Sequence, residues 1–190
     1  MVLPVTAYGH PVLRKVAKPV DKDYPGLEQF IDNMWETMYF SEGVGLAAPQ
    51  VNKSIRIFIV DATPYEEDMP EAKGFRKVFI NPEIIEEQGD EKLINEGCLS
   101  IPGIREDVAR PGQVHIQYYD RDWNFYDEWY DGMLGRIIQH EYDHLEGTLF
   151  TDKLSPVRKT ILRSRLSNIS KGKLEVGYKM IFPFEKKGKK

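Results

Sequence analysis

The sequence predicts an α+β fold, in which short antiparallel β-sheets pack around one central helix. Short β-branched and aromatic runs, separated by turn residues, recur along the chain and are typical of strands. Segments with apolar residues at helical spacing are fewer, and one of them follows these strands. With 190 residues, 41% of them hydrophobic and 29% charged, the chain has the size and composition of one globular domain.

The first predicted helix runs from Tyr24 to Phe40, because apolar residues recur on one side of it. We interpret this stripe as core packing rather than as a cofactor site. Its members are Leu27, Phe30, Ile31, Met34, Trp35 and Met38. The β-branched run from Ile55 to Val60 then predicts a strand. The polar, proline-containing stretch from Asp61 to Lys73 predicts a loop.

Further strands are predicted where β-branched and aromatic residues return. They cover Val78–Glu87, Glu91–Asn95, Gln113–Tyr119 and Phe125–Trp129. Asp120 to Asn124 is read as a turn, and Ile101 to Arg110 as a loop. Gly132 and Gly147 bracket the helix that comes next, which is of ordinary length.

The C-terminal part begins with a helix from Ser155 and Pro156 to about Ser167, since serine is a good helix cap and proline suits the first helical position. Leu174 to Pro183 alternates like a strand after this helix. We therefore predict one domain over residues 1–185, and a short disordered basic tail over residues 186–190.

The most informative motif is H-E-Y-D-H, formed by His140, Glu141 and His144. Residues four apart share a helix face, so both imidazoles point the same way and provide half of a tetrahedral metal site. Glu141 lies about 100° round the helix, where it can act as a general base without binding the metal. The alternative is a partly exposed helix whose histidines are solvated. The apolar flanks favour burial instead, namely Leu134, Ile137, Ile138 and Leu145.

Cys98 is the single cysteine, in the run Glu96-Gly97-Cys98-Leu99-Ser100. One cysteine cannot form an internal disulfide, so the fold relies on its core and a reducing compartment is its natural setting. A lone cysteine is usually a small buried hydrophobe. Beside an H-E-x-x-H helix, however, a thiolate and two imidazoles form a sound catalytic metal set with one position left for water.

Three segments resemble the signature motifs of peptide deformylases, in the order found in that family. They are Gly43 to Gln50 (G-V-G-L-A-A-P-Q), Glu96 to Ser100 (E-G-C-L-S) and Gln139 to His144 (Q-H-E-Y-D-H). The resemblance covers about residues 3–155. It implies removal of the formyl group from the N-terminal formylmethionine of new polypeptides. It also implies one divalent metal ion, Fe(II), with Ni, Co or Zn as substitutes.

By the same resemblance, Cys98, His140 and His144 bind the metal, and Glu141 is general base and then general acid. The side-chain amide of Gln50 and the backbone N–H of Leu99 would hold the developing oxyanion. Such donors suit a tetrahedral intermediate, and losing one typically costs about 2.7–4 kcal/mol.

The resemblance also implies a methionine pocket with its rim, lined by Val44, Gly45, Gly97 and Ile137. Arg105 would lie near the peptide substrate, and Arg110 would pair with Glu96; a solvated surface charge is the alternative for both arginines. Because carboxylates commonly orient metal-binding histidines, Glu96 and Asp143 are candidates for that role. The role of Arg136 stays open.

The net charge and the hydrophobic pattern of the chain indicate which binding partners to expect. The net charge of −4 argues against a general nucleic-acid binder, so no specific DNA or RNA sequence is expected. The start Met1 to Ala7 lacks the features of a signal peptide, and no apolar run reaches membrane-spanning length, so a cytoplasmic protein with no membrane partner is expected. Expected partners are N-formylmethionyl nascent peptides and, transiently, the ribosome. In some relatives a terminal helix docks there, whereas here a strand-like end and a basic tail follow.

Two alternatives remain. A zinc peptidase of the H-E-x-x-H class usually takes a third histidine or glutamate downstream, and none follows at metzincin spacing. A structural metal module needs a fourth protein ligand, for which only His10 and His115 are left, and both are interpreted as structural residues. The sequence therefore favours the deformylase.

Overall fold

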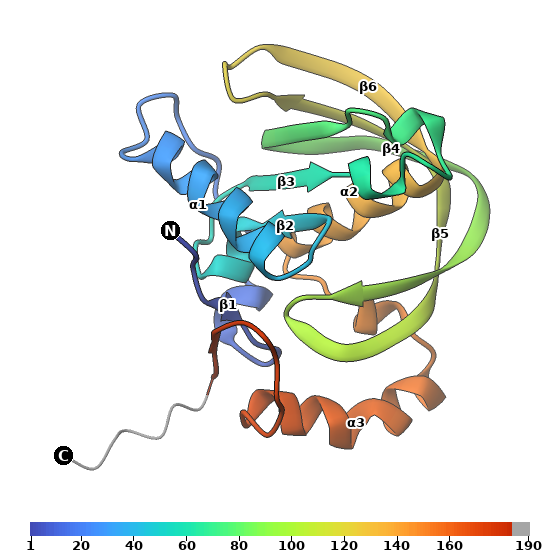
Figure 1. Ribbon diagram of the computed structural model, residues 1–190. Coiled ribbons are helices and arrows are strands. Elements are labelled where there is room, and N and C mark those ends of the chain that lie inside the picture. Colours follow the sequence, from blue (N-terminus) through green and yellow to red (C-terminus); the bar gives the residue numbers. More distant parts are fainter. Residues whose placement is uncertain (184–190) are drawn as a thin grey trace.

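A computed structural model describes residues 1–183 of the chain, so the predicted tail over 186–190 lies outside the described residues (Figure 1). The main sheet is antiparallel and has the strand order β2-β3-β4-β5-β6. Its strands are β2 (Gly45–Ala47), β3 (Ile57–Asp61), β4 (Arg76–Cys98), β5 (Ile101–Tyr119) and β6 (Phe125–Asp131). A second sheet pairs β1 (Val5–Thr6) with β7 (Met180–Ile181) in parallel.

The helices are α1 (Leu27–Phe40), α2 (Gly132–Leu145) and α3 (Pro156–Ser170). Five short 3₁₀ helices connect them: η1 (Pro11–Arg14), η2 (Ala48–Val51), η3 (Thr63–Tyr65), η4 (Pro70–Ala72) and η5 (Phe150–Lys153). None of the helices in the described part of the chain is long and apolar enough to cross a bilayer.

The two longest strands form a ribbon that curls around α2 (Figure 1). The β4–β5 register shifts at four places, between Ile80 and Glu83, Ile84 and Glu86, Gln88 and Glu91, and Gly97 and Cys98. An irregularity of this kind bends a strand and increases its local twist. The last of these shifts falls where the sequence predicts the metal ligand Cys98.

The core lies on both faces of β3. Phe58 and Val60 pack in one apolar cluster with α2, while Ile57 and Ile59 pack in a second cluster with α1. Alternate residues of a strand point to opposite faces, so a strand covered on both sides reads as a continuous apolar run. A third cluster joins α3 and η5 to the first half of β5. Helix α2 is thereby held in the middle of the molecule.

The α+β class, the central helix and the order of a C-terminal helix followed by a strand are confirmed. Several boundaries were wrong. The two strands predicted over Val78–Glu87 and Glu91–Asn95 are one strand of 23 residues, so this part of the sheet is long rather than short. The predicted loop Ile101–Arg110 is the beginning of β5. Its inward positions include Glu106 and Arg110, which are buried in ion pairs, and these charges conceal the alternation.

Two further boundaries differ at the ends of helices and strands. Helix α1 begins at Leu27 rather than Tyr24, because Gly26 has a φ of 72° and interrupts the helical backbone. Of the strand predicted over Leu174–Pro183, only Met180 and Ile181 are paired. The pairing ends there because β1, its partner, contributes only two residues.

Candidate active site

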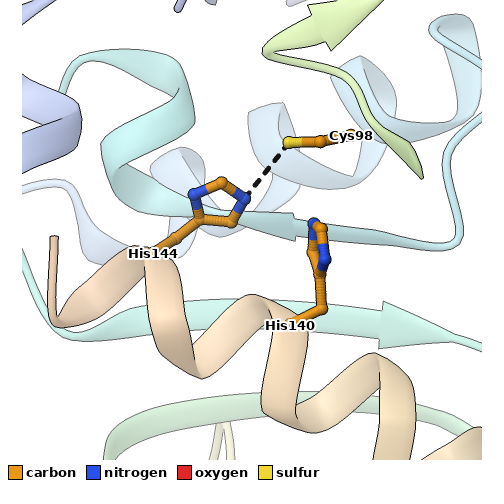
Figure 2. Close-up of side chains that lie close together, drawn as sticks. All are labelled: Cys98, His140 and His144. Atoms are coloured by element: carbon orange, nitrogen blue, oxygen red, sulfur yellow. Dashed lines mark hydrogen bonds between the residues drawn. The ribbon is translucent and has the colours of Figure 1, made fainter. Parts of the chain in front are cut away.

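Helix α2 and the end of β4 bring together three side chains that could hold a metal ion (Figure 2). His140 and His144 are buried and their ring centroids lie 5.1 Å apart. Cys98 approaches from the strand, with its Sγ 3.3 Å from Nε2 of His144. One donor atom from each residue can be chosen so that all three lie within 4.8 Å of one another.

This arrangement fits a metal ion. One thiolate and two imidazoles are a common donor set that leaves a position open for catalysis. Burial and the positive charges of His140 and Arg110 hold the pKa of His144 well below its usual value, so this ring is neutral, as a ligand must be. Burial also lowers the pKa of His140, but its hydrogen bonds to Cys98 and Glu96 raise it more. That proton has to leave before His140 binds a cation.

Glu141 lies beside this site in a space that only a glycine leaves free. A Cβ atom at residue 45 would come within 2.4 Å of Oε1 of Glu141. The other oxygen, Oε2, is buried without a hydrogen-bond partner within residues 1–183. Burial raises the pKa of Glu141 to about 7. A carboxylate with this pKa and one oxygen unengaged is suited to accept and return a proton near neutral pH.

The carboxylate of Glu96 orients His140. It accepts hydrogen bonds from Arg110 at 2.7 and 2.9 Å and from Arg136 at 2.8 Å, and it lies 2.9 Å from Nδ1 of His140. Although burial alone would raise the pKa of Glu96, the bonds to His140 and Arg110 hold it well below its usual range. Glu96 therefore stays ionised and fixes the ring so that Nε2 of His140 is free for a metal.

Arg110 extends this network, because its Nη1 atom donates to Asp143 at 2.7 Å. The predicted pairing of Arg110 with Glu96 is thus present in the structure. Among the described residues, Asp143 contacts Arg110 and Lys153 rather than a histidine, so its contact with the site is indirect. Arg136, whose role the sequence left open, is buried and binds Glu96 together with the carbonyls of Val108 and Lys92.

Gln50 is held with its amide nitrogen toward the thiol. Its Oε1 atom accepts the N–H of Ala47 at 2.8 Å, within the 3₁₀ helix η2. This leaves Nε2 3.4 Å from Sγ of Cys98 and 3.5 Å from Oγ of Ser100. Leu99 and Ser100 form the two-residue turn between β4 and β5 that follows Cys98. Gln50 and Leu99 therefore both lie next to Cys98.

These groups open onto a cleft of about 550 Å³, which shares part of its lining with a smaller cavity of about 100 Å³. Gln50, Cys98, Leu99, His140 and Glu141 line the cleft. Residues that line the smaller cavity are Val44, Tyr65, Asn95, Glu96, Gly97, Arg105, Met133, Arg136, Ile137, His140 and Glu141.

The family model for polypeptide deformylases matches residues 2–160. The chain belongs to this family. It is 55% identical to a peptide deformylase of Christiangramia forsetii and 50% identical to one of Flavobacterium johnsoniae, over the full length of both relatives and of this chain. A crystal structure of a peptide deformylase from Legionella pneumophila superposes with a TM-score of 0.79 at 35% identity, covering 91% of this chain and 98% of that one.

Membership of the deformylase family confirms the predicted enzyme class and activity. The chain is a hydrolase that removes the N-formyl group from newly made polypeptides, and metal dependence is general in the family. The alternatives of a zinc peptidase and of a structural metal module are wrong.

The structure brings most of the predicted pocket residues of the deformylase together. Val44, Gly97, Arg105 and Ile137 share the smaller cavity, whereas Gly45 lines only the larger cleft. Arg105 lies across Gly97, where a Cβ atom would come within 2.7 Å of its Nη1 atom. Its Nε atom donates to the Asn95 side chain at 2.7 Å.

Sequence reasoning missed Tyr65, Met133, Val176 and Tyr178, which also line these spaces. Tyr65 follows Pro64 in a stretch interpreted as a polar loop, and its aromatic ring was the one local signal. Met133 lies at the start of α2, before the apolar residues that marked the helix. Val176 and Tyr178 belong to the predicted C-terminal strand, and nothing in their own sequence indicates a contact such as that of Tyr178 with Leu99, 79 residues away.

Proposed function

We propose that Cys98, His140 and His144 hold one Fe(II) ion for the deformylation reaction, with Ni, Co or Zn as possible substitutes. The observation that carries this proposal is the convergence of the three donor atoms beside the buried carboxylate of Glu141. A metal ion in this position supplies Lewis acidity to the formyl carbonyl and to water. Thiolate and imidazole are ligands that all four ions accept, so geometry and supply decide among them.

Glu141 moves the proton in this proposal. Water adds to the formyl carbon while Oε2 of Glu141 takes one of its protons, and the same carboxyl group returns the proton to the departing nitrogen. The C–N bond breaks, and formate and a free methionyl amine leave. A buried carboxylate with a raised pKa supports both roles, because it binds and releases a proton near neutral pH.

Gln50 and Leu99 hold the oxyanion formed when water adds. The fixed orientation of Gln50 supports this role, because Ala47 engages its oxygen and leaves its N–H groups toward the cleft. The backbone N–H of Leu99 is the second donor. Donors that are set before the reaction stabilise charge that develops in the transition state.

The methionine side chain occupies the smaller cavity in this proposal. The walls of this cavity include Val44, Gly97 and Ile137, and Gly45 lies at its rim. In the same proposal, Arg105 lies beside the peptide backbone of the substrate. An unbranched thioether side chain suits a small cavity with apolar walls. Glu96, Arg110 and Asp143 keep the metal-binding histidine oriented from behind.

We further propose one catalytic domain over residues 1–185 that works in the cytoplasm and contacts the ribosome transiently. Helix α3 supports a ribosome contact, since it has four basic side chains and no acidic one. These are Arg158, Lys159, Arg163 and Arg165. An exposed basic helix binds RNA phosphates without reading their sequence.

The proposal is tested with protein purified without oxygen, by metal analysis and by hydrolysis of formyl-Met-Ala-Ser beside acetyl-Met-Ala-Ser. We expect about one Fe(II) per chain and turnover of the formyl peptide only, because the acetyl group carries an additional methyl at the reacting carbon. Equal turnover of both peptides would rule out a site selective for formyl groups. A preparation that is fully active with Cys98 replaced by alanine would rule out the ligand set.

A further inference from the structure

The chain returns to the active site after α3. We call residues 174–182 the C-terminal strap. Within it, Met180 and Ile181 pair with Val5 and Thr6, so that the strap lies beside the N-terminal segment (Figure 1). Backbone hydrogen bonds of 2.8 Å join Val5 to Lys179 and Ala7 to Ile181. Three strap side chains pack on the cluster formed with α3, namely Leu174, Met180 and Phe182.

One side chain of the strap reaches the turn that follows the metal ligand. The hydroxyl group of Tyr178 donates a hydrogen bond of 2.8 Å to the backbone carbonyl of Leu99. Tyr178 and Val176 also line the 550 Å³ cleft that contains Cys98 and Glu141. Tyr178 is therefore part of the cleft wall and is bonded to the backbone of the turn that follows Cys98.

The N-terminal segment holds the same turn from its other residue. The N–H of Tyr8 donates to the carbonyl of Ser100 at 2.9 Å. Both carbonyls of the two-residue turn are thus bound by segments that pair with each other through β1 and β7. The β4–β5 ladder itself is irregular between Gly97 and Cys98, so the sheet alone does not set the turn.

The orientation of this turn matters for the reaction, because Leu99 is the proposed backbone donor to the oxyanion. A backbone N–H helps only if it points at the position that the oxyanion takes, and small misplacements reduce rates. The bond to the carbonyl of Leu99 holds the peptide plane that Leu99 shares with Ser100, whereas the N–H of Leu99 lies in the plane shared with Cys98 at the end of β4. With both planes held, rotation about the Leu99 Cα that would turn the N–H away is restricted.

We propose that Tyr178 is a positioning residue for deformylation, whose hydroxyl group holds Leu99 in the orientation that binds the oxyanion. This inference rests on the proposed role of Leu99. Tyr178 acts through the backbone of Leu99 and transfers no proton. The C-terminal strap, which lies outside the three signature motifs, is therefore part of the catalytic apparatus.

Tyr178→Phe tests the proposal, because it keeps the ring in the cleft wall and removes only the hydroxyl group. We expect kcat for formyl-Met-Ala-Ser to fall about 5- to 50-fold, less than the 10²–10³ that follows loss of an oxyanion donor. KM, metal content and melting temperature should stay near those of the wild type. Tyr39→Phe is the matched control. Tyr39 lies on α1, outside the cleft, and this variant removes a hydroxyl group that donates a hydrogen bond to Asp61. Its kcat should not change.

Four results would overturn the inference: unchanged kcat, a rise in KM alone, metal loss with activity restored by added metal, or a lower melting temperature with unchanged kcat of the folded protein. Each assigns the hydroxyl group to another role or to none. Failure of the proposed function is distinguishable, because then wild-type protein would not discriminate formyl from acetyl peptides. Gln50→Ala, measured in parallel, reports whether an oxyanion donor limits the rate.

Discussion

The position of the proposed general base, Glu141, depends on a residue that has no side chain. The carboxylate of Glu141 occupies the space in which a Cβ atom at Gly45 would lie. Gly45 was expected among the residues that line the methionine pocket and its rim, and the space left by its absent side chain is filled by the carboxylate of Glu141. A methyl group at residue 45 is therefore expected to displace the carboxylate of Glu141 and impair catalysis while the protein still folds.

For Gly45→Ala we expect a folded enzyme whose kcat is lower by on the order of 10²-fold, because the new methyl group displaces the carboxylate of Glu141 from its reacting position. Steady-state kinetics and a thermal melt measure both properties. Gly74→Ala is the control: a Cβ atom there meets nothing within 4 Å and Gly74 does not line the cleft, so its positive φ should lower the melting temperature while kcat stays unchanged. Full activity of Gly45→Ala would show that Glu141 tolerates displacement.

The raised pKa of the buried Glu141 carboxyl predicts how the stability of the metal-free protein depends on pH. Its folded-state pKa of about 7 lies above the ordinary value of 4.5, so the folded protein binds this proton more tightly than the unfolded chain. The stabilisation linked to this proton is present below pH 4.5 and is lost as the pH rises through about 7. Above that pH the ionised carboxylate costs up to about 3 kcal/mol.

Glu141→Gln should therefore be more stable than the wild type at pH 8 when both are free of metal, and about equally stable near pH 4.5. Denaturant unfolding of the two metal-free proteins across this range measures the difference. With metal bound, the variant should retain the ion and lose nearly all turnover. A stability difference that does not change with pH would contradict the raised pKa.

The third prediction for a single residue concerns the amide of Gln50. Gln50→Ala should reduce kcat about 10²–10³-fold with full metal content, because its bond to the oxyanion is strongest in the transition state. Gln50→Glu should be at least as impaired, since it puts negative charge where negative charge develops. If Gln50 only stabilises η2 through its bond to Ala47, both variants would melt earlier and keep a near-normal kcat.

At the level of secondary structure, the β4–β5 ribbon contributes charged side chains that hold His140 of the proposed metal site in place. Glu96 on β4 and Arg110 on β5 meet in the interior, 3–5% exposed, and bind His140 and Asp143 of α2. A buried pair of this kind leaves an uncompensated charge when one partner is removed. The ribbon and the helix are therefore joined by charge as well as by apolar packing.

Arg110→Ala should destabilise the fold by about 3–5 kcal/mol, because Glu96 and Asp143 lose a buried cation. Arg121→Ala is the matched control: Arg121 bonds Glu28 and Asp32 at the surface, where solvent screens such pairs and they contribute little to stability. Chemical denaturation of both variants tests the contrast. Equal losses would mean that burial of the Arg110 network contributes nothing.

The sequence predicted the elements whose pattern is local. Helix α2 was found because its apolar residues and its histidines repeat at helical spacing, and α3 because Ser155 and Pro156 mark its start. The first half of β5 was missed, because Glu106 and Arg110 occupy inward positions and their partners are distant in sequence. A buried charge cannot be recognised before its counter-ion is known.

At the scale of the whole molecule, the proposed metal ligands and the proposed base follow from motif spacing and from resemblance to a family. Arg136 and Tyr178 were not assigned, because each acts through a contact with a residue 40 or more positions away. A contact of this kind depends on the final packing of several elements rather than on any local pattern. The proposed catalytic residues and the Glu96–Arg110 pair were thus predictable, whereas the contacts of Arg136 and Tyr178 were not.

Ribosome binding, if α3 provides it, is a property of the whole surface and should depend on salt. We expect co-sedimentation with ribosomes to weaken at least about tenfold between roughly 50 and 200 mM salt, as phosphate contacts do. Lys159→Glu with Arg163→Glu should weaken it further and leave hydrolysis of free formyl-Met-Ala-Ser unchanged. Binding that ignores both salt and charge reversal would exclude α3 as the docking element.

The parallel pairing of β1 with β7 has a consequence for the order in which the enzyme is made. Synthesis proceeds from the N-terminus, so β1 leaves the ribosome long before its partner strand exists, and the loop between them contains almost the whole described chain. Closing so long a loop is slow compared with local folding. The turn at Leu99 is held by both ends, so the orientation proposed for Leu99 is set only after the strap is translated. A nascent copy of this enzyme therefore contains Cys98, His140 and His144 before it has the contact from Tyr178.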